Sequence, residues 1–386
     1  MDQKNHAAYK RVAGGVCLCV LGIILTAGLW PFHVPTNQVE WLKNEDGLQF
    51  GRHGSVVTSG AIRGNSPTYA SATLEIWLEP AHVESGGTIL SFDGSTHPGE
   101  PFSLHQKGNS FGIRLNNVDP QGVSRTALFY VDRVSQKNPL FVTIVLDSQG
   151  ASVYINGVLA GGSWLSRTWN DLTGRIVLGN SPTADDSWAG KILGLAVYQR
   201  ELTASQIAAD YANWTSTGHP VPATDRDAAA LYLFDERGGK VVHNRLDPAT
   251  DFTIPAHYFV LHPGFLVAPW KAYHPTWSYW QDVGVNIAGF VPLGFCVVAY
   301  LSLTRAIKHP AATTVILGFF TSLSIELLQV LLPTRDSDIT DLITNTLGTV
   351  IGVMVYRSSI CQALLTKAKV AIARTNLSGV GVRSPR

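Results

Sequence analysis

Polar residues recur at helical spacing inside two apolar segments between residues 319 and 355. Ser322, Glu326 and Gln329 follow at intervals of four and three, so a helix would carry them on one face. After the polar turn 332–338, which holds Arg335, the same spacing relates Asp338, Asp341, Asn345, Gly348 and Gly352. An ionisable residue in an apolar span costs about 2.5–3.5 kcal/mol on insertion scales and therefore usually faces a protein interior or a watery cavity. We predict a polar site at this hairpin.

This hairpin resembles the VanZ-like family of small integral membrane proteins. The motif is E-x-x-Q on one apolar segment, then R, then D-x-x-D-x-x-x-N-x-x-G-x-x-x-G on the next. The family's second signature is an Asp and an Asn ahead of F-x-P-x-G, and it matches Asp282, Asn286, Phe290, Pro292 and Gly294. The resemblance covers about residues 280–356 and implies a bacterial envelope protein, in a family named for a member linked to glycopeptide-antibiotic resistance. It does not define a reaction.

Eight residues form what we call the polar cluster, namely Asp282, Asn286, Glu326, Gln329, Arg335, Asp338, Asp341 and Asn345. Three roles fit these residue types. They can hold the helices together by hydrogen bonds. They can bind a lipid head group, with Arg335 holding a phosphate or carboxylate through two parallel hydrogen bonds. They can be catalytic, with Glu326 or Asp341 acting as acid or base on a lipid-linked substrate.

Charge and topology place these elements in a membrane. Residues 1–11 form a basic cytoplasmic N-terminus, 12–30 an uncleaved transmembrane anchor, and 283–357 a membrane domain with spans 284–304, 310–332 and 338–356. Arg305, Lys308 and the basic tail 358–386 carry the positive charge expected of cytoplasmic segments. We therefore predict a multi-pass protein of the bacterial cytoplasmic (inner) membrane, with residues 31–283 outside the cytoplasm.

Composition narrows the range of functions. The formal net charge of the 386 residues is +1, and no basic stripe with interleaved aromatics appears, so we expect no nucleic-acid partner. The four cysteines, Cys17, Cys19, Cys296 and Cys361, lie in or beside apolar spans. The long middle of the chain therefore has neither a disulfide framework nor a cysteine zinc site.

Residues 39–212 predict an exported all-β domain. Short alternating runs separated by Gly, Asn, Asp and Pro are typical of an antiparallel jelly-roll sandwich, and Asn156-Gly157 predicts a tight hairpin. The order of strands resembles the laminin-G-like, concanavalin A-type fold of lectins and glucanases. The matching late signature is Gly179, Asn180, Asp185, Asp186, Trp188, Gly190, Tyr198, Arg200, Leu202, Thr203, Gln206 and Ile207. The domain extends to residue 250 if the segment 230–250 completes the sandwich; the alternative is a separate strand pair near the membrane.

Two ligand sites are considered on this domain. Trp164, Trp169 and Trp188 would stack on sugar rings if exposed, or belong to the core. Asp93, Asp185 and Asp186 lie at strand ends, where they would hold calcium or simply form turns. The glucanases of this fold carry E-x-D-x-x-E, whereas the nearest stretch here, Glu75 to Glu79, lacks the middle Asp and is interpreted as the solvent face of a strand. We therefore do not expect a glycosidase.

Residues 252–282 are rich in Trp, Tyr and His, and we expect an interfacial aromatic segment, because amphipathic rings favour the membrane–water boundary.

Together these features predict an integral membrane protein of the cell envelope. Its exported sandwich recognises a glycan or glycoconjugate, and its VanZ-like domain binds a lipid-linked partner. Two alternatives stay open: a membrane enzyme that acts on a lipid-linked substrate through Glu326 and Asp341, and a structural membrane anchor.

Overall fold

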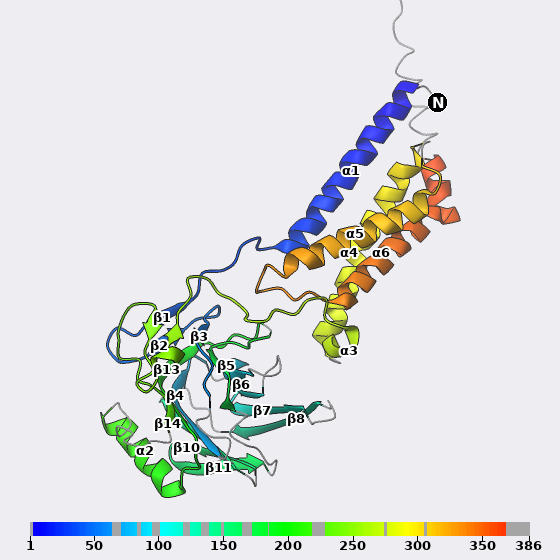
Figure 1. Ribbon diagram of the computed structural model, residues 1–386. Helices are drawn as coiled ribbons and strands as arrows, with labels where there is room; N and C mark the ends of the chain where they lie inside the picture. Colours follow the sequence, from blue (N-terminus) through cyan, green and yellow to red (C-terminus); the bar gives the residue numbers. More distant parts are fainter. Residues whose placement is uncertain are drawn as a thin grey trace, which may run out of the picture. The chain divides into compact units, whose positions relative to one another are not determined.

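The computed structural model divides the chain into two compact units (Figure 1). The sandwich unit runs from Val34 to Pro263, and the helical unit combines Met1–His33 with Gly264–Arg386. The structure describes residues 3–63, 71–82, 86–94, 101–118, 124–132, 139–147, 150–163, 172–183, 185–217, 228–273, 276–304 and 307–367.

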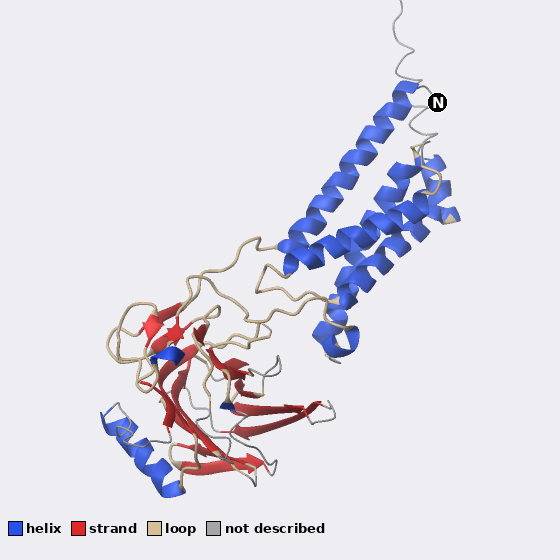
Figure 2. Cartoon of the chain, viewed as in Figure 1, coloured by secondary structure: helices blue, strands red, loops and turns tan. Residues whose placement is uncertain are grey.

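Two antiparallel eight-stranded sheets form the sandwich unit (Figure 2). The first has the order β1 (Val39–Trp41), β2 (Leu48–Phe50), β13 (Gly190–Tyr198), β4 (Ala72–Pro80), β9 (Leu140–Leu146), β10 (Ala151–Ile155) and β11 (Val158–Ser163), with β14 (Ala228–Tyr232) also on β13. The second has the order β15 (Val241–Val242), β16 (Phe252–Thr253), β3 (Val56–Thr58), β12 (Arg175–Leu178), β5 (Gly86–Asp93), β6 (Phe102–Lys107), β7 (Ser110–Val118) and β8 (Ser124–Asp132). The all-β sandwich prediction is confirmed.

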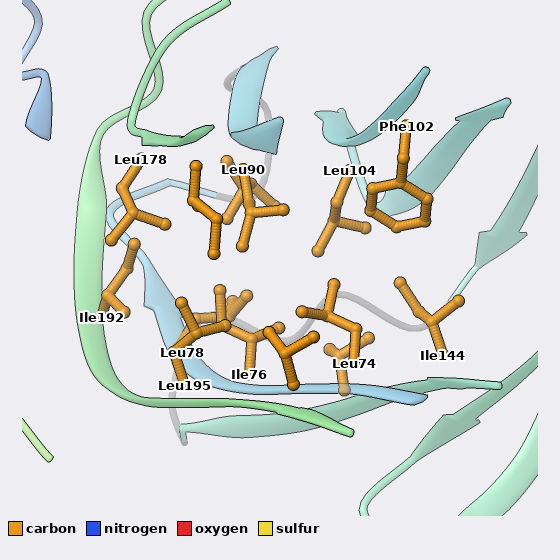
Figure 3. Packing of buried hydrophobic residues seen from close by; sticks show 14 of the residues in the cluster. Leu74, Ile76, Leu78, Leu90, Phe102, Leu104, Ile144, Leu178, Ile192 and Leu195 are labelled. Carbon is orange, nitrogen blue, oxygen red and sulfur yellow. The ribbon is translucent and has the colours of Figure 1, made fainter. Parts of the chain in front are cut away.

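Side chains along each strand point alternately to the two faces of the sheet, and the inward-facing apolar side chains form the core. On β4, Leu74, Ile76 and Leu78 face inward, and Figure 3 shows them opposite Leu90 and Leu104 of the second sheet. The predicted hairpin joins β10 to β11 at Asn156 and Gly157, both of which have the positive φ that this turn requires (53° and 77°).

The segment after residue 228 completes the sandwich, which resolves the question left open by the sequence. β14 pairs with β13, while β15 and β16 extend the second sheet from β3. The prediction of an interfacial segment from residue 252 is therefore wrong for its first part, because Phe252 and Tyr258 are buried in the sandwich unit. In the second part, Trp270, Trp277 and Trp280 are exposed, and His274 lies outside the described residues.

Helix α2 (Ala204–Thr217) lies over the outer face of the first sheet. Thr203 and Gln206 form a capping box at its start: the Thr203 hydroxyl accepts from the Gln206 amide, and the Gln206 side chain accepts from the Thr203 amide (2.9 Å). Beneath this helix Glu75 is fully buried, so its prediction as a solvent-facing residue is wrong. The strand does alternate, but α2 covers the face that would otherwise meet water.

The helical unit contains four helices long and apolar enough to cross a membrane, as predicted. They are α1 (Gln3–Leu29), α4 (Trp277–Ser302), α5 (Pro310–Gln329) and α6 (Ile339–Arg357), and the short α3 (Pro269–Ala272) precedes α4. Large apolar side chains are exposed along them, among them Leu327, Leu328 and Met354, as a lipid-facing surface requires. Arg305 and residues 368–386 of the basic tail lie outside the described part.

Glycines let α6 approach α4 closely, as the G-x-x-x-G spacing predicts. A Cβ added at Gly348 would lie 2.2 Å from the Ile287 carbonyl oxygen, and one at Gly352 would lie 2.2 Å from that of Val291. Gly294 of α4 meets the Thr349 carbonyl in the same way. The motif glycines therefore set the distance between the two helices that carry half of the polar cluster.

Candidate functional site

A cavity of about 620 Å³ opens at one end of the helical unit. The end of α1, the start of α4, the end of α5, the turn 333–338 and the start of α6 all contribute to its wall. All eight residues of the polar cluster line it, so the structure brings together what the sequence predicted as a set. The chain leaves the bundle for the sandwich, and returns from it, at this same end.

Glu326 serves the local structure of the wall. Its carboxylate accepts a hydrogen bond from the backbone amide of Asp338 (2.9 Å), and its side chain is 1% exposed. Asp338 in turn caps α6, because its carboxylate accepts from the amide of Thr340. These contacts fix the entry of the chain into α6 and support a structural role for both carboxyl groups.

Two amides connect helices. The Gln329 side chain donates to the carbonyl oxygen of Gly28 (2.9 Å), which joins α5 to α1. The Asn345 side chain donates to the hydroxyl of Ser322 (3.0 Å), which joins α6 to α5. In an apolar bundle such bonds hold the helices in register, as the structural role requires.

Arg335 is engaged differently from the expected phosphate grip. Its Nε and one terminal nitrogen both donate to the Trp30 carbonyl oxygen, at 3.0 and 2.8 Å. That oxygen lies just beyond α1, where carbonyl groups lack partners within the helix. The guanidinium therefore caps α1, and part of its donor set is used within the protein.

Asp282, Asn286 and Asp341 form the wall on the side of α4 and α6. The side chains of Asn286 and Asp341 are hydrogen-bonded to each other, and Asp282 is exposed. Sequence reasoning missed other lining residues, including Thr276, Tyr279, Thr334, Asp336 and Thr340. Their spacing alone does not separate them from ordinary turn and helix-end residues.

Four polar atoms on cavity-lining residues are buried without a hydrogen-bond partner in the protein: Gln329 Oε1, Thr334 Oγ1, Thr340 Oγ1 and Asn345 Oδ1. A buried polar atom left unpaired costs about 1–3 kcal/mol. Gln329 and Asn345 are only 7% and 5% exposed. The cavity wall therefore has hydrogen-bonding capacity beyond what the helices use.

Trp188, the one predicted sugar-stacking tryptophan within the described residues, is not available to a sugar. Trp188 is completely buried, and its indole nitrogen donates to the side chain of Gln106 (2.7 Å). The assignment of Trp188 to a glycan site is therefore wrong, because its ring packs into the core against Phe50. Trp164 and Trp169 lie outside the described residues.

The three candidate calcium ligands have separate partners. Asp93 pairs with His262 (3.0 Å), Asp185 accepts from the Tyr258 hydroxyl (2.5 Å), and Asp186 accepts from Thr88. Within the described ranges, no group of three or more His, Cys, Asp or Glu side chains is arranged to hold a metal ion. The aspartates thus bond to other side chains of their own unit and do not gather into one acidic group.

A serine, a histidine and an aspartate meet on the outer face of the second sheet, which the sequence did not predict. His105 Nε2 lies 2.8 Å from the Ser103 hydroxyl, and its Nδ1 lies 3.4 Å from Asp186 Oδ2 and 3.0 Å from the Thr88 hydroxyl. The three residue types are those of a nucleophile, a base and an orienting acid, but the Ser103 side chain is 0% exposed. We interpret this set as a hydrogen-bonded network within a covered sheet face.

Burial alone would raise the pKa of Asp186. Hydrogen bonds from His105 and Thr88, together with the charges of His105 and Arg114, outweigh it and hold that pKa below its usual value.

Comparison with known proteins identifies both parts of the chain. The profile of the VanZ/LLP1 family matches residues 240–362, and that of the concanavalin A-like lectin/glucanases superfamily matches residues 50–208. The first match begins inside the sandwich unit, at β15. Comparison with curated proteins gave no significant match.

Several solved structures resemble this chain distantly. A protein from Bacteroides ovatus is 14% identical, with 55% of this chain and 58% of that protein covered and a TM-score of 0.39. A heptameric pentraxin from Limulus polyphemus is 17% identical (44% and 78% covered, TM-score 0.31). The sialidase module CBM40 of Ruminococcus gnavus, bound to sialyllactose, is 16% identical (43% and 96%, TM-score 0.33). The chain thus spans little more than half of the first of these proteins. The two family matches, together with the four apolar helices, describe a multi-pass membrane protein that joins a concanavalin A-like sandwich to a VanZ-like domain.

Proposed function

We propose that the protein is a receptor of the bacterial cell envelope whose helical unit binds a lipid-linked partner in its cavity and whose sandwich recognises a glycan or glycoconjugate. The observation that carries this proposal is the cavity itself: about 620 Å³ with a polar wall, inside an apolar bundle. Its size falls within the range of about 300–1,000 Å³ typical of small-ligand sites. The match of the sandwich to a superfamily of lectins supports the glycan part.

The proposed topology follows from charge. Basic residues before α1 and after α6 favour a cytoplasmic location for both ends of the bundle, in the inner membrane. The cavity would then open toward the outer face, the side on which lipid-linked envelope precursors and glycans are exposed. Structural bonds made by Glu326, Gln329 and Asn345 do not exclude binding, because the same residues also line the cavity.

Two glycines of α4 provide a matched test. A Cβ at Gly289 or at Gly284 meets no atom within 4 Å, but only Gly289 is among the residues that line the cavity. Gly289→Leu should therefore fill the cavity, and Gly284→Leu should add the same side chain outside it. The full chain and both variants would be reconstituted in nanodiscs with a bacterial envelope lipid extract, and co-purifying lipids identified by mass spectrometry.

We expect a retained lipid that is lost with Gly289→Leu and kept with Gly284→Leu. Equal retention by both variants would contradict a lipid site in the cavity. A lipid that is chemically changed by the wild-type protein would instead support the enzyme alternative, which rests on the carboxyl groups of Glu326 and Asp341 in the same wall. An array of envelope glycans, probed with the full chain in nanodiscs, tests the sandwich.

A further inference from the structure

The charge of the cavity wall indicates what kind of head group it would accept. Five carboxyl groups line the cavity, those of Asp282, Glu326, Asp336, Asp338 and Asp341. Among the described lining residues the only cationic side chain is Arg335, and two of its nitrogen donors are directed at the Trp30 carbonyl. Such a wall attracts a positive charge and repels a phosphate, since like charges at short range destabilise one another.

Unpartnered oxygens add an independent indication. Gln329 and Asn345 are more than nine-tenths buried, both line the cavity, and the amide oxygen of each has no partner in the protein. The amide nitrogens of the same two side chains already donate to Gly28 and Ser322. Each amide nitrogen thus has one of its two N–H donors engaged, whereas each amide oxygen is wholly unpaired, so a matching ligand should supply N–H or O–H donors to these oxygens.

We infer that the cavity selects a lipid whose head group carries a primary ammonium group. An ammonium has three N–H donors and one positive charge, so it satisfies buried acceptors and carboxylates together. A quaternary ammonium has the charge without the donors, and a glycerol head group has the donors without the charge. This inference rests on the proposed lipid-binding function and specifies the chemistry of that same cavity.

Two sources would present this group at a membrane surface. One is a phospholipid with an ethanolamine head group, and the other is a lipid-linked amino sugar. The dimensions of the cavity admit either one, because about 620 Å³ accommodates a head group of one sugar ring or less. Both share the ammonium, which is the group that the cavity wall would recognise.

The first arm of the test compares phospholipids on the wild-type protein. The full chain in nanodiscs would be exchanged against equimolar phosphatidylethanolamine, phosphatidylcholine and phosphatidylglycerol of identical acyl chains, and the retained lipids quantified by native mass spectrometry. We expect retention of phosphatidylethanolamine to exceed that of the other two by on the order of tenfold, because hydrogen bonds to charged groups are among the stronger ones. The second arm repeats the comparison with an alkyl glucosaminide against the corresponding alkyl glucoside, and the arm with the larger preference identifies the source.

Charge variants test the wall. Asp341→Asn and Asp282→Asn keep the shape of each side chain and remove its charge, and each should lower the ammonium preference at least about fivefold. Glu201→Gln, at an exposed position of the sandwich unit, is the matched control and should have no effect. The wild-type head-group series requires no variant to fold, so it stands even if a substitution destabilises the bundle.

The outcomes separate the two proposals. Equal retention of all head groups, or a preference for phosphatidylglycerol, together with loss of lipid in Gly289→Leu, would overturn the ammonium inference and leave the lipid cavity in place. Lipid retention that is insensitive to Gly289→Leu would overturn both. An ammonium preference that persists in both aspartate variants would also overturn the inference, because the cavity wall would not be its origin.

Discussion

Each unit contains carboxyl groups that the sequence marked as candidate ligands, and the surroundings of the two sets differ. In the sandwich, Asp93, Asp185 and Asp186 each bond to a side chain of the same unit. In the helical unit, five carboxyl groups surround one cavity, and buried acceptors beside them have no partner in the protein. Hydrogen-bonding groups that the fold leaves unpaired around a cavity indicate a ligand site. An aspartate that is paired with another side chain indicates a structural role instead.

Glu75 is the clearest exception within the sandwich, although Asp93 Oδ1 and Glu236 Oε2 are also buried without a partner. Neither carboxyl oxygen of Glu75 makes a hydrogen bond of standard geometry, and the side chain is packed under α2 beside Tyr198, between Thr143 and Ala196 of the neighbouring strands. Burial raises the pKa of Glu75 well above its usual value, and the charge of Asp210 adds to this. The burial of Glu75 is a cost to the fold, and neither of the two cavities described in the helical unit includes it.

The largest effect should come from closing the space between α4 and α6. Gly348→Ala places a methyl group 2.2 Å from the Ile287 carbonyl oxygen, so the helices must separate, and overpacking of this kind costs about 1–3 kcal/mol. Hydrogen exchange of the reconstituted protein should show faster exchange in α4 and α6. Gly15→Ala is the control, because a Cβ there meets nothing within 4 Å. Equal exchange in the two variants would mean that the cavity wall does not depend on this close contact.

Glu75→Gln should stabilise the sandwich near neutral pH. The folded protein keeps the Glu75 proton above the unfolded pKa of 4.5, so stability falls as pH rises from there toward the raised folded pKa. We therefore expect a gain in the free energy of unfolding at pH 7 and none below pH 4.5. Hydrogen exchange of β4 and β9 in the full chain at several pH values measures it. A gain that does not depend on pH would point to packing instead of ionisation.

Asp186→Asn should have a smaller effect of the opposite pH dependence. The lowered pKa of Asp186 stabilises the fold above the unfolded value of 3.8, and this stability is lost as pH falls toward the folded pKa. Because 48% of the side chain is exposed, solvent reduces the effect to less than about 1 kcal/mol. The variant should lose stability at pH 7 and unfold less steeply between pH 4 and pH 2 in an acid titration followed by fluorescence. If the variant had the wild-type acid profile, the hydrogen bonds of His105 and Thr88 to Asp186 would not stabilise the fold through the charge of Asp186.

The smallest expected effect is on serine reactivity. Ser103 has the hydrogen bond of an activated serine but no exposed surface, so a fluorophosphonate probe should label the wild-type chain and Ser103→Ala to the same extent. Labelling of wild type that disappears in the variant would make the sandwich a hydrolase and reverse the comparison between the two units.

Local patterns alone were enough to predict much of this protein. Alternation of apolar residues, as on β4, predicts strands because side chains point to opposite faces with a period of two, and Asn156-Gly157 predicts its turn because both residues tolerate positive φ. Apolar length predicted the four spans. The spacing of three and four placed the members of the polar cluster on shared helix faces, and all eight line one cavity.

Tertiary structure decided what each polar side chain does. The partners of Arg335 and Gln329 lie about 300 positions earlier in the chain, at Trp30 and Gly28, and no local pattern can specify them. The same holds for Trp188, whose residue type fits a sugar platform but whose ring is enclosed by the two sheets, and for Glu75, whose strand face is covered by α2. Period and length are properties of neighbouring residues, whereas burial and pairing depend on which distant segments come together, and that is settled only when the whole chain has packed.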